Sequence, residues 1–80
     1  MTKFGLRIIN EHFDQSAEME ASDVIQAWQK AIASAVTIAA DMVSHGNPFF
    51  GAEVTLTEGN KQIGRYLVSV GATSLKTDGD

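Results

Sequence analysis

The sequence predicts an α+β domain in which one long helix packs on a three- or four-stranded, mainly antiparallel sheet. Residues 22–45 keep an unbroken helical period over a segment that contains no glycine or proline. Residues 3–9 and 52–57 alternate apolar and polar side chains, and residues 62–70 are rich in strand-forming residues. The order is therefore strand, an optional short strand, helix, strand and strand. A helix laid over one sheet face buries the apolar side of each element.

The size of the chain limits it to one domain. It has 80 residues, and we expect a single domain over residues 1–75 followed by a disordered polar tail over residues 76–80. A chain this short buries a smaller share of its surface than a larger domain does, so its stability as a monomer would be modest. It contains no cysteine, so neither a disulfide nor a thiolate metal site can supplement the core.

The first predicted strand, residues 3–9, has one apolar side. Its inward side chains are Phe4, Leu6 and Ile8, and its outward residues are Lys3, Gly5 and Arg7. Residues 11–20 admit two interpretations, a short strand near residues 18–20 or an irregular loop. In either case Phe13 and Met19 are the side chains expected to reach the core.

Short polar residues and a glycine mark the ends of the predicted helix. Ser22 or Asp23 can accept a hydrogen bond from a free N–H group in the first turn. Gly46 can adopt the left-handed conformation that closes many helices, and Pro48 prevents the helix from continuing. The stripe predicted to face the sheet is Ile25, Trp28, Ile32, Ala35, Val36, Ala39, Met42 and Val43.

The helix has more apolar surface than one sheet face needs. A second flank carries Val24, Ala27, Ala31 and Ile38. An apolar arc of this width either lies deep under the sheet or contacts a second chain. We therefore predict a homodimer that uses this flank, the outer sheet face or both. The alternative is that the alanines are present simply as good helix formers.

Residues 52–70 predict a β-hairpin. Gly59 and Asn60 tolerate the positive φ angle that a tight turn over residues 58–61 requires. Gly64 lies inside the last strand, which predicts a bulge or a close approach of another group to the backbone.

Two features of the predicted sheet remain open. The strand–helix–strand order permits the first and third strands to lie parallel, joined by a right-handed crossover. The inward side of residues 62–70 is also ambiguous, because both sides carry apolar residues. One side has Tyr66, Val68 and Val70, and the other has Ile63 and Leu67.

Two adjacent phenylalanines follow the helix and are the candidate partner-binding residues. We expect one of Phe49 and Phe50 to cover the last helical turn and the other to be available to a partner or ligand. The alternative is that both pack in the core or in an oligomer contact.

The sequence predicts no catalytic, metal-binding or cofactor-binding residues. His45 falls in the last helical turn, where we expect a capping role. His12 has Glu11 and Asp14 nearby, but neighbouring residues rarely converge on one ion, and no second histidine is placed to join them. No nucleophile, base and orienting group can be assembled.

The charge of the chain argues against nucleic acid and membrane partners. A net charge of −4 opposes non-specific binding to RNA, DNA or anionic lipid. Four basic residues would share a sheet face if the first and last strands were neighbours: Lys3, Arg7, Lys61 and Arg65. Cross-strand pairing with Glu53 and Glu58 is the favoured use of these charges. No charge-free apolar segment reaches the roughly 20 residues of a membrane span, so we expect a cytoplasmic protein.

The chain resembles a family of small proteins of about this length that are grouped as a domain of unknown function. The order of four segments carries the resemblance. They are residues 4–8, 18–28, 31–46 and 53–70. The resemblance covers nearly the whole chain, rests on alanine spacing and a hairpin, and implies a fold and very little about function. The chain departs from the family at residues 21–23, where Ala-Ser-Asp replaces the usual Leu-Pro-Asp start of the helix.

A weaker resemblance is to the dodecins, small flavin-storing assemblies with one helix on a three-stranded sheet. It is carried by residues 28–41, by Phe50 and by the hairpin that follows. The indole expected to stack on flavin near Phe49 or Phe50 is replaced by phenylalanine, and the segment between the first strand and the helix is much longer. This resemblance implies flavin binding as one alternative function.

The sequence thus predicts a small non-enzymatic interaction or accessory protein that acts as a homo-oligomer, with a dimer favoured and no cofactor expected. The alternatives are a dodecin-like small-molecule binder and a weak nucleic-acid-binding sheet face. The identity of any protein partner does not follow from the sequence.

Overall fold

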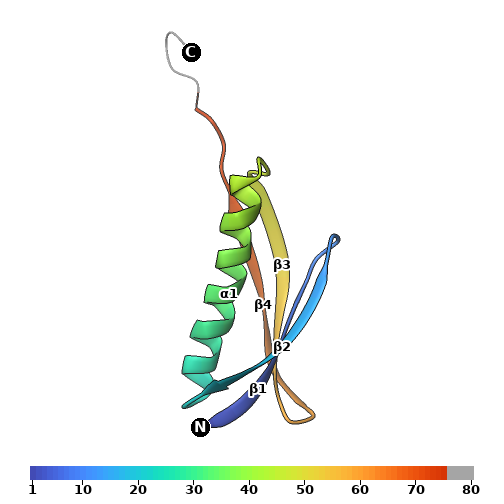
Figure 1. Ribbon diagram of the computed structural model, residues 1–80, viewed down its shortest axis with the longest axis vertical. Coiled ribbons are helices and arrows are strands. Elements are labelled where there is room, and N and C mark those ends of the chain that lie inside the picture. Colours follow the sequence, from blue (N-terminus) through green and yellow to red (C-terminus); the bar gives the residue numbers. More distant parts are fainter. Residues whose placement is uncertain (76–80) are drawn as a thin grey trace.

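The computed structural model describes residues 1–75 and shows one helix packed on a four-stranded antiparallel sheet (Figure 1). The elements are β1 (Thr2–Ile9), β2 (Asp14–Ala21), α1 (Val24–Ser44), β3 (Phe49–Glu58) and β4 (Lys61–Gly71). The predicted α+β fold is confirmed, in its four-stranded form. The tail predicted over residues 76–80 lies outside the described residues.

The strands lie in the order β2-β1-β3-β4, and each neighbouring pair is antiparallel. The parallel alternative for the first and third strands is therefore corrected, because β1 pairs antiparallel with β3. Residues 11–20 resolve into a turn and a full strand. The turn is held by the Asn10 side chain, which accepts hydrogen bonds from the backbone N–H groups of His12 and Phe13 at 2.8 and 3.1 Å.

Both ends of α1 are capped by the residues that the sequence indicates. The Asp23 carboxylate accepts a hydrogen bond from the Gln26 N–H at 2.8 Å, and the Gln26 side chain accepts one from the Ser22 N–H at 2.7 Å. At the other end Gly46 has a φ of +93°, and its N–H donates to the Val43 carbonyl at 3.0 Å. The Asn47 N–H donates to the Met42 carbonyl at 3.1 Å. These two bonds form a Schellman motif, which ends the helix.

The face that α1 buries differs from the predicted one. The buried ridge consists of four alanines spaced by four residues: Ala27, Ala31, Ala35 and Ala39. Methyl side chains let the helix approach the sheet closely, and larger sheet residues such as Val54, Leu56 and Phe50 fill the core. The prediction that Ile25, Val36 and Val43 face the sheet is wrong, because these three side chains are exposed.

The β3–β4 hairpin settles the two uncertainties in the last strand. Tyr66, Val68 and Val70 pair with residues of β3 that face α1, so they form the inward side. The register shifts between Leu56 and Thr57, opposite Gly64, which confirms the predicted irregularity.

Gly64 also lies under the ring of Trp28, because a β-carbon added at Gly64 would be 2.9 Å from the Trp28 Cζ2 atom. The predicted close approach is therefore confirmed. The turn before β4 contains Gly59 and Asn60, and only Gly59 has a positive φ, of +62°.

Candidate functional site

One side of the molecule combines an apolar helix flank with a free sheet edge. Successive helical residues are rotated by about 100°, and the middle of the buried ridge, between Ala31 and Ala35, faces the sheet. Trp28 lies to one side of this ridge and contacts β4, where its ring meets that of Tyr66 edge-on with 4.2 Å between centroids. A row of β-branched residues lies further around the helix in the same direction, at about 80–120° from the ridge. They are Ile25, Ile32, Val36 and Val43.

We call this row, together with the free edge of β4, the β4-side surface. Ile25 is 70% exposed, Val36 46% and Val43 40%, and Ile32 is half-buried. On β4 itself Leu67 is 75% exposed. Figure 1 shows β4 at the edge of the sheet beneath α1, and no described strand lies beyond it. Large apolar side chains of α1 are thus exposed on the flank toward β4, whereas Leu67 lies on the opposite face of the sheet, because its neighbour Glu53 faces away from α1.

The four residues predicted as an oligomer face do not come together on the surface. Ala27 and Ala31 are fully buried against the sheet, so that part of the prediction is corrected. Val24 is exposed in the first helical turn, and Ile38 is half-buried on the side of β1 and β2. The helical period alone does not distinguish the two flanks. The regular spacing of Ala27, Ala31, Ala35 and Ala39 was the signal that could have placed the ridge correctly.

The two phenylalanines have different environments, as the sequence indicated. Phe50 is buried in the core and its ring stacks on Phe13, with 6.3 Å between centroids. Phe49 is exposed and lies beside Gly71 at the end of the hairpin. Both residues begin strand β3, and Phe50 belongs to the core cluster that contains Ala39 and against which Met42 of the last helical turn packs. Partner binding by Phe49 stays a prediction.

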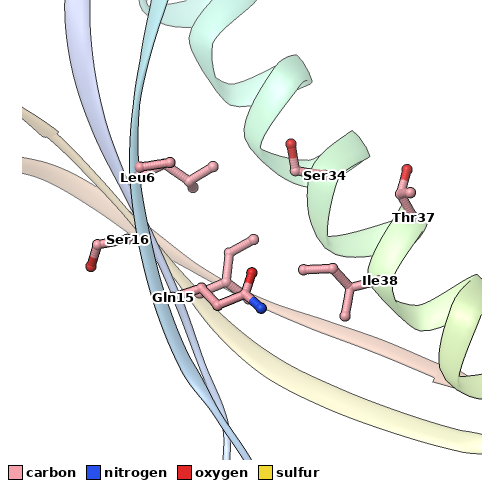
Figure 2. A pocket seen from close by; sticks show the side chains of 8 residues that line it. Leu6, Gln15, Ser16, Ser34, Thr37 and Ile38 are labelled. Carbon is pink, nitrogen blue, oxygen red and sulfur yellow. The ribbon is translucent and has the colours of Figure 1, made fainter.

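The opposite flank of α1 forms a groove with β1 and β2 (Figure 2). Its volume is about 340 Å³, and it is lined by Leu6, Ile8, Gln15, Ser16, Ala17, Ser34, Thr37 and Ile38. In Figure 2 the Gln15 side chain reaches toward the helix, whereas Ser16 points away from it. The hydroxyls of Ser34 and Thr37 donate to the carbonyls of Lys30 and Ala33 within α1.

The lining of this groove limits its chemistry. None of the eight lining residues carries a titratable side chain, so the groove offers no acid–base pair. The helix hydroxyls keep only their acceptor lone pairs, and Gln15 supplies the one amide group of the lining. The groove therefore suits a neutral, mainly apolar molecule.

The histidines take part in local contacts only. His45 is the C-terminal cap of α1, with its Nδ1 atom 2.8 Å from the Asp41 carbonyl oxygen, which confirms the capping prediction. His12 lies 3.3 Å from the Glu11 carboxylate, and both are exposed. Within residues 1–75, no three His, Asp or Glu side chains come together in a way that could hold a metal ion.

Two pairs of oppositely charged side chains join neighbouring strands of the sheet. Arg7 donates two hydrogen bonds to Asp14, at 2.9 and 2.6 Å. These bonds hold the pKa of Asp14 below its usual range and raise the pKa of Arg7. Arg65 forms an ion pair with Glu53, as the sequence indicated. Because β3 separates β1 from β4, the four basic residues considered above do not lie on neighbouring strands.

These features define a small α+β domain with an apolar surface at one sheet edge and a neutral groove at the other. Comparison of the chain with protein-family models, curated proteins and solved structures finds no match. In the part of the chain that the structure describes, no helix combines the length and the apolar character needed to cross a membrane.

Proposed function

We propose that this protein is a small non-enzymatic interaction domain that acts as a homo-oligomer and binds through its β4-side surface. The observation that carries the proposal is the exposure of Ile25, Val36 and Val43 on the helix flank toward β4, an edge strand that also exposes Leu67 on the other face of the sheet. Grouped apolar residues of this size on a surface usually mark a site of association. The proposal includes a cytoplasmic location, which the lack of cysteine supports.

A charge placed in the apolar row tests this proposal. We expect Ile25→Lys to weaken assembly, because burying an unpaired ammonium in a contact is unfavourable. Ile25 is 70% exposed, so the substitution leaves the fold intact. The matched control is Ala33→Lys, which adds the same charge at an exposed position outside the row.

Sedimentation velocity over low to high micromolar concentrations is the measurement. We expect the wild type and Ala33→Lys to sediment as oligomers and Ile25→Lys to shift toward the monomer. A wild-type chain that stays monomeric at high micromolar concentration contradicts the proposal. An Ile25→Lys variant that assembles as well as the control contradicts the assignment of the surface.

A second candidate function is the binding of a neutral apolar small molecule in the groove, which its volume and uncharged lining favour. Native mass spectrometry of gently purified protein would detect a retained ligand. The Ile38→Glu variant would no longer retain that ligand. Flavin, the ligand implied by the resemblance to dodecins, would appear as yellow colour in the same sample. The groove lining supplies no aromatic ring to stack on flavin.

Nucleic-acid binding by the sheet face would appear as a salt-sensitive shift of labelled single strands.

A further inference from the structure

We propose that the partner on the β4-side surface is a second copy of this chain, and that the two β4 strands pair antiparallel with Leu67 on the two-fold axis. The pairing would join two four-stranded sheets into one of eight strands. This inference rests on the proposed function, since it names the partner and the geometry of the same surface.

The two free edges of the sheet differ in how they are protected. Strand β2 carries Glu18 and Glu20, besides Asp14, which is paired with Arg7. Acidic side chains along an edge oppose the approach of a second copy of the same strand. Strand β4 carries no acidic residue, and its Lys61 stands at the first position of the strand, beside the turn. Between Gln62 and Gly71 its one charged residue is Arg65, and Arg65 is already neutralised by Glu53 of the same sheet.

The side chains of β4 select one register for this pairing. With Leu67 on the axis, Leu67 faces its own copy on the outer side of the sheet. On the same outer side, Arg65 of each chain then lies opposite Ser69 of the other, and on the inner side Tyr66 lies opposite Val68. Centring the pair on Arg65 instead would oppose two guanidinium groups, which is unfavourable. Centring it on Tyr66 would place Arg65 against Leu67.

The apolar row on α1 fits the same arrangement. Helix α1 packs mainly on β3, and β4 is the next strand outward. Strand spacing of about 4.8 Å then places the two β3 strands, and so the two helix axes, roughly 14 Å apart. Directly packed helices lie about 8–10 Å apart. The remaining space lies between the facing rows of Ile25, Ile32, Val36 and Val43 and above Tyr66 and Val68, so apolar side chains can fill it.

Cysteine cross-linking tests this geometry without interference, because the natural chain has no cysteine. In the Leu67→Cys variant the two cysteines face each other across the two-fold axis. Their Cα atoms are then within the separation of about 4.4–6.8 Å that a disulfide needs. Leu67 is exposed, so the variant keeps the fold. The matched control is Ser69→Cys on the same strand face. Its two thiols would be about 14 Å apart, given about 3.4 Å per residue, which is too far to be bridged.

Non-reducing gels, run after mild oxidation at about 10 µM protein, measure how fast covalent dimers form. We expect Leu67→Cys to form covalent dimers roughly 100-fold faster than Ser69→Cys, because thiols held together reach an effective concentration in the millimolar range. A mixture of Arg65→Cys and Ser69→Cys should cross-link as pairs. If sedimentation shows an oligomer but Leu67→Cys does not cross-link faster than Ser69→Cys, the inference fails and the proposed function stands. If the wild-type chain is monomeric, both fail.

Discussion

Replacing Gly64 by alanine is the most direct test of how the helix meets the last strand. The new β-carbon would lie 2.9 Å from Cζ2 of Trp28 and 3.7 Å from its Cη2 atom. The ring cannot move freely, because it also packs edge-on against Tyr66. We therefore expect Gly64→Ala to force a shift of either the ring or the strand.

The expected magnitude follows from two opposing effects. Overpacking a well-filled core costs about 1–3 kcal/mol. Removing a glycine restricts the unfolded chain and offsets about 0.4–1 kcal/mol of this. The net loss in the free energy of unfolding is about 1–2 kcal/mol, which corresponds to a decrease of about 5–15 °C in Tm for a domain of this size.

Urea unfolding followed by far-UV circular dichroism, at one fixed protein concentration, measures this loss. The control is Gly51→Ala on β3, where an added β-carbon meets nothing within 4 Å and stability should be unchanged or slightly higher. In a Trp28→Phe background, which lacks the contacting ring atoms, Gly64→Ala should cost at least about 0.5 kcal/mol less. A Gly64→Ala variant as stable as the wild type would show that the reasoning about this contact is wrong.

Three further predictions concern stability. Arg7 lowers the pKa of Asp14, so this pair contributes to the stability of the fold above the ordinary carboxyl pKa of 3.8. The contribution is lost as the pH falls through the lower pKa of the folded state. Asp14→Asn should remove that part of the acid dependence of Tm. Asp23→Ala should cost about 1 kcal/mol in thermal unfolding, whereas Asp23→Ser should not, because serine also caps. Ala35→Leu should cost about 1–3 kcal/mol because Ala35 is fully buried, and Ala33→Leu should stay within about 0.5 kcal/mol.

The order of the elements and the ends of the helix could be predicted because local chemistry determines them. Asp23 and Gly46 act on the backbone within one turn of their own positions. Gly64 likewise indicated a bulge and a close contact by its presence inside a strand. Strand β2 could not be predicted with the same certainty, because its side chains are mostly polar and exposed and leave little apolar alternation.

The rotation of α1 could not be predicted, because it depends on packing between distant segments. Two adjacent apolar stripes compete on this helix, and the period of 3.6 residues fits both. The large side chains of the sheet decide between them, because Val54, Leu56 and Phe50 leave room only for the alanine ridge. The sequence does not indicate the candidate surface for the same reason, since the helical period assigns Ile25, Val36 and Val43 to the core, whereas they are exposed.

Amide hydrogen exchange along both sheet edges tests the central claim most directly, because it reports whether a second chain covers β4. At high micromolar concentration, the account predicts slow exchange for the outward amides of β4 around Leu67 and fast exchange for those of β2. On dilution the β4 amides should lose their protection while those of β2 stay unchanged. Equal exchange at both edges, independent of concentration, would contradict the account.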